Sequence, residues 1–213
     1  MSEFPCAATF TLEGPAGGLE TLAACPKPEN DRGATVVICH PHPLYGGTLD
    51  NKVVHTLSRV FVELGFRAVR FNFRGVGKSA GSFAHGHGET DDLLAVVAWV
   101  RAQRPNDRLW LAGFSFGAYV ALRAAVASNA AGLVTVAPAV HLYDFAALNL
   151  PTCPWLLIQG EADEVVPVEK VRAWLAEISV QPEVLLLPGV GHFFHQRLHE
   201  LGTALRKFVP AHL

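Results

Sequence analysis

Ser115 stands between two glycines in the sequence Gly113-Phe114-Ser115-Phe116-Gly117. An apolar run at 109–112 precedes it and a run of small residues at 118–127 follows, which predicts a strand and then a helix. This pattern is the signature of a nucleophile elbow, where the glycines allow a tight turn in which a Cβ would clash. The N-terminus of the helix would direct backbone N–H groups at the serine, where they can stabilise an oxyanion.

A serine hydroxyl needs a base within hydrogen-bond reach, and the base needs an orienting carboxylate. Asp163 follows the predicted strand 154–159 in Gly160-Glu161-Ala162-Asp163-Glu164, and His192 follows the predicted strand 183–187 in Gly189-Val190-Gly191-His192. Residues placed after parallel strands meet at the carboxyl edge of a sheet. We therefore predict that Ser115 is a nucleophile, His192 its base and Asp163 the orienting acid.

Other residues of the same types have structural interpretations. Asp163 itself could cap the helix that begins near Pro167, although its loop position favours the catalytic role. The remaining candidates are Glu161 and Glu164, predicted to be solvated loop charges, Asp144, predicted to be a surface or turn residue, and His195 and His199, predicted to form a polar helix face.

Apolar segments alternate with amphipathic ones, which predicts a mostly parallel, doubly wound α/β sheet with helices on both faces. The predicted strands are 7–12, 19–25, 34–39, 67–72, 108–113, 131–137, 154–159 and 183–187. Besides the helix after Ser115 and the one near Pro167, the predicted helices are 50–64, 89–104 and 195–208. The Gly/Pro turn at 14–18 predicts a hairpin between the first two strands.

Over its whole length the chain resembles the α/β hydrolases. The resemblance rests on the segments already quoted around Ser115, Asp163 and His192, on Arg74-Gly75-Val76-Gly77-Lys78-Ser79, and on the loop 40–48 after the third strand. The last of these, with the short chain, is similar to small lidless bacterial serine hydrolases related to the dienelactone hydrolase-like branch. Dienelactone hydrolases use a cysteine nucleophile, where this chain has Ser115.

The resemblance implies an oxyanion hole made by two backbone N–H groups. One would come from Phe116 and the second from the loop after Cys39, where His42 aligns with the usual donor and Leu44 or Tyr45 is the alternative because Pro43 has no N–H. Only residues 138–154 are available for a lid, so we expect an eight-stranded fold without a lid domain and with an open active site. The residues expected at the mouth are Tyr45, Phe114, Phe116, His141, Leu142, Tyr143 and Phe193.

Length and composition narrow the class of protein. The 213 residues predict one domain, 1–213, and the net charge of -2 without a basic run argues against nucleic acid or an anionic membrane as partner. The N-terminus lacks the pattern of a signal peptide, and the four scattered cysteines favour reduced thiols in a cytoplasmic protein, with Cys39 buried in a strand. Oligomeric state is left open.

Two further patterns resemble cofactor sites. The pairs His40/His42 and His85/His87 could supply imidazoles to a metal, but we interpret them as loop residues. The segment 75–80 imitates nucleotide-binding motifs without their strand and helix context, so we expect a tight turn beside the active site. We predict no cofactor or metal and a small ester or thioester as substrate, with a peptidase, amidase, acyltransferase or non-catalytic binding protein as alternatives.

Overall fold

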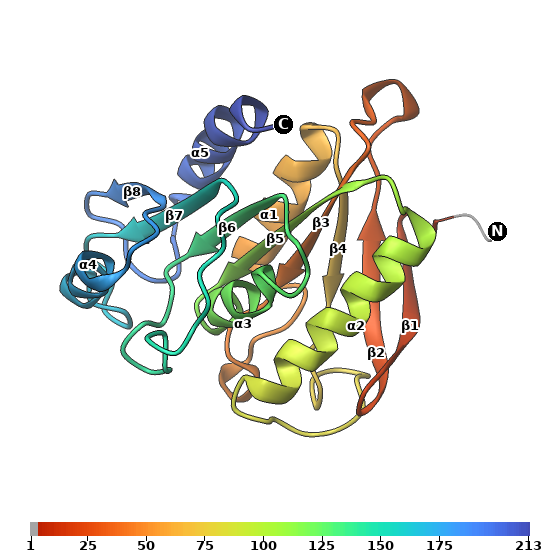
Figure 1. Ribbon diagram of the computed structural model, residues 1–213, viewed down its shortest axis with the longest axis horizontal. Coiled ribbons are helices and arrows are strands. Elements are labelled where there is room, and N and C mark those ends of the chain that lie inside the picture. Colours follow the sequence, from red (N-terminus) through yellow and green to blue (C-terminus); the bar gives the residue numbers. More distant parts are fainter. Residues whose placement is uncertain (1–3) are drawn as a thin grey trace.

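The computed structural model describes residues 4–213 as an open sheet with helices on both faces (Figure 1). Its strands are β1 (Ala8–Gly14), β2 (Gly17–Ala24), β3 (Ala34–Cys39), β4 (Arg67–Phe71), β5 (Arg108–Phe114), β6 (Gly132–Val136), β7 (Trp155–Gly160) and β8 (Glu183–Leu187). Its α-helices are α1 (Lys52–Glu63), α2 (His87–Gln103), α3 (Phe116–Ala125), α4 (Val168–Glu177) and α5 (Leu198–Ala211). Short 3-10 turns cover Pro28–Asn30 and Pro43–Tyr45.

The sheet has eight strands in the order β1-β2-β4-β3-β5-β6-β7-β8. Strands β3 to β8 pair in parallel, while β1 and β2 add an antiparallel hairpin at one edge. The predicted mostly parallel α/β-hydrolase sheet is therefore confirmed. The hairpin loop is tighter than expected because β1 extends to Gly14 and β2 begins at Gly17, which adopts a positive φ of 108°.

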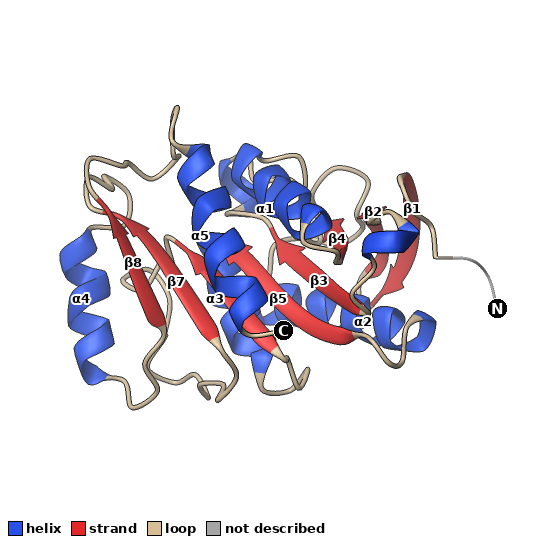
Figure 2. Ribbon diagram, turned by 90° about the horizontal axis from the view of Figure 1, so that it is seen from above, coloured by secondary structure: helices blue, strands red, loops and turns tan. Residues whose placement is uncertain are grey.

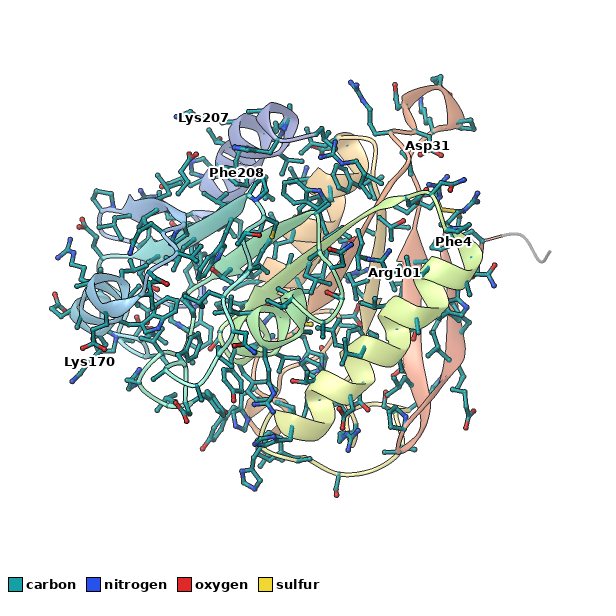
Figure 3. All side chains as sticks on the ribbon, viewed as in Figure 1. Phe4, Asp31, Arg101, Lys170, Lys207 and Phe208 are labelled. Atoms are coloured by element: carbon teal, nitrogen blue, oxygen red, sulfur yellow. A yellow bond between two sulfur atoms is a disulfide. The ribbon has the colours of Figure 1, made fainter. Side chains whose placement is uncertain are left out.

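Two hydrophobic cores hold the layers together. Helices α1 and α5 pack on one face of the sheet, and α2, α3 and α4 pack on the other (Figure 2). The central strands β3, β5, β6 and β7 are buried on both faces, apart from Arg108 at the start of β5, which explains their continuous apolar sequences. Side chains fill the space between the sheet and both helical layers (Figure 3).

The helix boundaries differ from the predictions where caps and loops decide them. Helix α1 begins at Lys52 because the Asn51 side chain accepts a hydrogen bond from the Val53 N–H and caps the helix. Helix α5 begins at Leu198, three residues later than predicted, because Phe194 and Gln196 adopt positive φ angles that no helix accommodates.

The cysteine prediction was wrong for one pair. Cys6 and Cys25 form a disulfide, because Cys6 bridges to Ala23 at the end of β2 and the two cysteine Cα atoms come within 5.4 Å. Cys39 is a buried free thiol as predicted, and burial raises its pKa; Cys153 is also free.

The segment between β6 and β7, residues 137–154, forms only turns and bends. No helix among residues 4–213 is long and apolar enough to cross a membrane.

Candidate active site

Ser115 occupies the sharp turn between β5 and α3. Its φ of 55° lies in the left-handed region, a strained conformation for a residue with a side chain. A Cβ on Gly113 would collide with the Gly117 carbonyl, and a Cβ on Gly117 would collide with the Cys39 carbonyl. Only glycine fits at both positions, as the sequence predicted, and helix α3 begins immediately after the serine rather than at residue 118.

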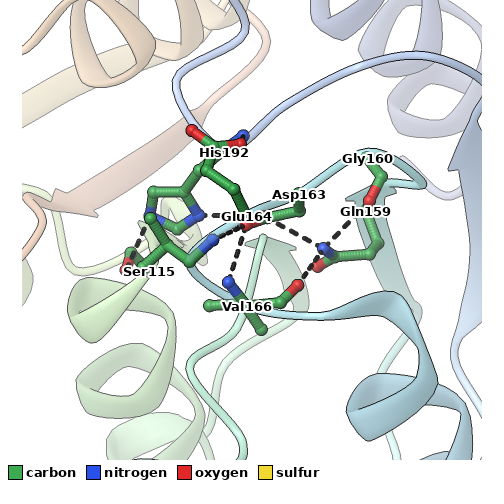
Figure 4. A network of polar contacts seen from close by, with 8 residues as sticks. Ser115, Gln159, Gly160, Asp163, Glu164, Val166 and His192 are labelled. Atoms are coloured by element: carbon green, nitrogen blue, oxygen red, sulfur yellow. Dashed lines mark hydrogen bonds and ion pairs between the residues drawn. The ribbon is translucent and has the colours of Figure 1, made fainter.

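The structure brings Ser115, His192 and Asp163 together in one hydrogen-bonded chain (Figure 4). His192 Nδ1 lies 2.9 Å from Asp163 Oδ2, and His192 Nε2 lies 3.1 Å from Ser115 Oγ. An ionised carboxylate can only accept, so Nδ1 carries the proton and Nε2 is free to take the proton of the serine. All three side chains are buried.

Asp163 is held in place by three donors besides His192. Its Oδ1 accepts from the Val165 and Val166 N–H groups at 2.9 and 2.6 Å, and its Oδ2 accepts from Gln159 Nε2 at 3.0 Å. These bonds fix the carboxylate toward the imidazole, and none of them caps α4, which begins at Val168. The alternative role of Asp163 as a helix cap is therefore not what the structure shows.

The role of Gln159 as a hydrogen-bond donor to Asp163 was not predicted from the sequence. Gln159 is fully buried in β7, where its Nε2 also donates to the Gly160 and Val166 carbonyls at 3.2 and 3.0 Å. A lone amide directly after the apolar run Trp155–Ile158 is the signal that could have identified it, because a buried polar side chain needs a partner.

The other acidic candidates lie outside the chain of hydrogen bonds. Glu161 is exposed, as predicted, but also pairs with Arg172, and Asp144 is an exposed residue that accepts from the Ala147 N–H. Glu164 is exposed but is more than a solvated charge, since its Oε2 accepts from the His192 N–H at 3.2 Å (Figure 4). Glu164 thus helps to fix the backbone that carries the histidine.

Two residues predicted as backbone donors of the oxyanion hole, Phe116 and His42, line the same pocket as Ser115. Among residues 4–213 the structure records no internal acceptor for the N–H of Phe116 or of His42. The alternative donors are engaged, since the Leu44 N–H donates to His42 Nδ1 at 3.1 Å and the Tyr45 N–H donates to the His42 carbonyl at 3.2 Å. His42 and Phe116 lie side by side, with ring centroids 5.3 Å apart.

Two hydrogen bonds made by the His40 side chain hold the loop that carries His42. His40 Nδ1 donates to the Pro41 carbonyl at 2.6 Å, and Nε2 accepts from the Phe73 N–H at 3.0 Å. Burial lowers the pKa of His40 to about 4, so the ring stays neutral and keeps both bonds at neutral pH. Burial also lowers the pKa of His42, against an opposing effect of Glu89.

A pocket of about 260 Å³ opens over Ser115 and His192. Five residues predicted at the mouth line it: Tyr45, Phe116, Leu142, Tyr143 and Phe193. The predictions for Phe114 and His141 were wrong: neither lines the pocket in the described part of the chain. Phe114 is fully buried, with its ring centroid 5.0 Å from that of His192, and His141 is exposed to solvent.

His85, His87 and the glycine-rich segment have structural partners. Of the two histidines predicted to form a polar helix face, His199 lies in α5, whereas His195 precedes the start of the helix at Leu198. His87 Nδ1 lies 2.8 Å from Arg123 Nη2, and His85 packs on Phe83. Within residues 4–213 no group of three or more potential metal ligands is found. Residues 75–80 form the predicted tight turn, closed by the Gly75 N–H donating to the Ala80 carbonyl at 3.0 Å, but this turn does not contribute to the pocket.

A serine, an acid and a histidine in this chain order, hydrogen-bonded at the carboxyl edge of a parallel sheet, are the arrangement of an α/β serine hydrolase. Residues 19–151 match the family model of the X-Pro dipeptidyl-peptidases (S15 family). The chain is 48% identical to XC6422 from Xanthomonas campestris, described as an α/β serine hydrolase without lid, over 99% of this chain and 97% of that one, with a TM-score of 0.95.

A second solved structure, an α/β serine hydrolase homologue from Coxiella burnetii, is 47% identical over 97% of this chain and 99% of that one, with a TM-score of 0.93. The chain therefore belongs to the lidless α/β serine hydrolases, with a domain of the S15 family. Est1E from Butyrivibrio proteoclasticus, solved with ferulic acid bound, shares the fold at 18% identity, with a TM-score of 0.82 over 95% of this chain and 98% of that one. None of these matches specifies the dienelactone hydrolase branch, which stays a prediction.

Proposed function

We propose that this protein hydrolyses small carboxylic esters or thioesters through an acyl-enzyme, with Ser115 as nucleophile, His192 as base and acid, and Asp163 as orienting carboxylate. The observation that carries the proposal is the unbroken chain of hydrogen bonds from Asp163 through His192 to Ser115, which ends in an open pocket. The family membership agrees with this chemistry.

In the first half-reaction the Ser115 Oγ–C bond forms as His192 Nε2 takes the hydroxyl proton. The carbonyl π electrons move to oxygen, and the oxyanion then returns them as the bond to the leaving oxygen or sulfur breaks. His192 gives its proton to the leaving group. In the second half-reaction a water repeats the sequence on the acyl-serine, releasing the carboxylic acid and restoring the serine hydroxyl.

The oxyanion of both intermediates is proposed to lie between the backbone N–H groups of Phe116 and His42. Both donors lack an internal acceptor within residues 4–213, whereas Leu44 and Tyr45 already use theirs. A donor without an internal partner costs no hydrogen bond when the oxyanion arrives, and the loss of one such donor typically slows catalysis about 10²–10³-fold.

The pocket favours a neutral and apolar acyl group. No carboxylate, lysine or arginine is among the described residues that line it. Its rim is formed by four exposed hydrophobic residues, here called the apolar collar: Tyr45, Leu142, Val165 and Phe193. Its 260 Å³ lies just below the range of about 300–1,000 Å³ usual for ligand pockets, which suits small substrates.

A second candidate is cleavage of an X-Pro dipeptide, which the S15 match favours. Such a substrate presents an N-terminal ammonium, and charged groups bind in proteins through oppositely charged or strong acceptor partners. The absence of a carboxylate among the described lining residues weighs against that substrate. Ester hydrolysis is therefore the better supported activity.

The test uses 4-nitrophenyl acetate, 4-nitrophenyl thioacetate and Ala-Pro-4-nitroanilide with the wild-type protein and Ser115→Ala. We expect turnover of the two acyl substrates, little of the anilide, and a loss of at least about 10³-fold in kcat in the variant. A fluorophosphonate probe should label the wild type alone. Labelling of a folded Ser115→Ala protein would overturn the nucleophile assignment, and anilide turnover above ester turnover would favour the peptidase.

The single domain 1–213 and the cytoplasmic location remain proposals as well. Disulfides persist chiefly in oxidising compartments, so the oxidation state of the pair Cys6–Cys25 in cells of the source organism tests that location.

A further inference from the structure

A lysine without a carboxylate partner stands beside the pocket. Lys52, the first residue of α1, is half-buried, and its Nζ donates to His195 Nδ1 at 2.8 Å. Among residues 4–213 no aspartate or glutamate lies within 4.0 Å of Lys52 Nζ. Asp50, two residues before Lys52, pairs with Arg70 instead, and Glu164, in the loop that carries Asp163, accepts from the His192 N–H.

The contact between Lys52 and His195 places this charge against the loop that carries His192. His192 must give its proton to the leaving oxygen, so the leaving group lies next to His192 during the reaction. His195 belongs to the same loop, three residues beyond His192, and Phe193 between them lines the pocket. The hydrogen bond from Lys52 therefore joins the start of α1 to the loop that borders the departing alcohol.

Asn51 adds a second donor at the same border. It lines the pocket, and its Oδ1 is fixed by accepting from the Val53 N–H at 2.9 Å. Because Oδ1 is held as the helix cap, the Nδ2 group is the free end of the amide, and within residues 4–213 the structure records no acceptor for it. Asn51 and Lys52 thus offer adjacent hydrogen-bond donors, one neutral and one charged.

We propose that Asn51 and Lys52 are specificity-determining residues that favour esters whose alcohol part carries an anionic oxygen group, such as a carboxylate or a phosphate. This inference rests on the proposed ester hydrolysis and assigns the two sides of the site different tasks. Tyr45, Leu142 and Val165 of the apolar collar contact the acyl part, Phe193 borders the alcohol part, and the pair Asn51–Lys52 binds the charged end of the alcohol part.

The test compares two acetate esters that differ only in charge: 4-carboxyphenyl acetate and 4-carbamoylphenyl acetate. Lys52→Met should lower kcat/KM about fivefold for the carboxylate ester and leave the carbamoyl ester nearly unchanged, as expected for one partly solvated ion pair. The loss should disappear at about 1 M salt, which screens such a pair. Lys52→Arg should restore the preference, since it keeps the charge.

Two further variants separate this effect from general damage. Asn51→Asp keeps the cap of α1 but replaces the free amide by a negative charge, so it should disfavour the carboxylate ester more than Lys52→Met does. Lys207→Met on α5 removes an exposed lysine that does not line the pocket (Figure 3 shows its place on the helix) and should leave both esters unchanged. Equal effects of Lys52→Met on the two esters, or no effect on either, would overturn the inference. Failure of the wild type to hydrolyse either ester would instead overturn the proposed function.

Discussion

The disulfide between Cys6 and Cys25 should contribute stability without contributing to catalysis. It closes a loop with a sequence separation of 19 residues. In the chain-entropy treatment a loop of this length restricts the unfolded state by about 3 kcal/mol at 25 °C. For a chain of this size each kcal/mol corresponds to about 2–4 °C in Tm, so we expect the variant Cys6→Ser/Cys25→Ser to melt about 6–12 °C lower.

The position of the bond predicts that activity is unaffected. Strand β2 runs antiparallel to β4, and its last residue, Ala24, pairs with Ala68 near the start of β4. The disulfide therefore lies at the amino ends of the parallel strands, whereas Ser115 and its partners follow the carboxyl ends of β5, β7 and β8. The kcat/KM of the double variant at 25 °C should match that of the wild type.

Thermal unfolding with and without a reductant measures the effect, and Cys153→Ser, which removes a free thiol and keeps the bond, is the matched control. Titration of thiols in denaturant without reductant should find two in the wild type, from Cys39 and Cys153. Four reactive thiols, or a wild-type Tm that equals the double variant and ignores the reductant, would refute the reasoning.

Two other predictions follow from buried polar groups. Gln159→Leu removes the side-chain donor to Asp163 Oδ2. We expect kcat to fall about tenfold because one hydrogen bond to a charged group is lost, and steady-state kinetics with a circular dichroism check of folding measures this change. An unchanged kcat would show that the backbone donors to Asp163 suffice. The folded-state pKa of His40 is lowered to about 4, below its unfolded value of about 6.5. Between these two pH values the unfolded chain binds one more proton than the folded chain. The free energy of unfolding should therefore fall on acidification, by up to about 1.4 kcal/mol per pH unit. Urea unfolding of wild type and His40→Asn from pH 6.5 to 4 measures this slope, and an equal slope in the two proteins would contradict the assignment.

The sequence was sufficient for the parts of the molecule that depend on spacing and periodicity. Glycines around Ser115 predicted the turn because only that residue type avoids the backbone collisions found there. Asp163 and His192 could be predicted because each follows an apolar strand of a parallel sheet, and such strands share one carboxyl edge.

Features that depend on packing in three dimensions could not be predicted in this way. Gln159 acts through side-chain contacts within a buried strand, where periodicity gives no information about hydrogen bonding. The pairing of Cys6 with Cys25 depends on the N-terminal segment returning beside Ala23, which no local pattern encodes. Phe114 and His141 were misplaced because strand alternation and loop direction, not chain proximity, decide which side chains reach the pocket.

The connection between β6 and β7 contributes Leu142 and Tyr143 to the lining of the pocket but none of the hydrogen-bonded residues around Ser115. Phe145 of this connection is buried in the core, but the exposed residue Leu142 can change in evolution with little consequence for the reactive groups, because surface positions tolerate change far better than buried ones do. Relatives with the same sheet could acquire different substrate ranges by remodelling this one connection. Exchange of Leu142 and Tyr143 for the residues of homologues is accordingly expected to redirect the protein toward a new acyl group.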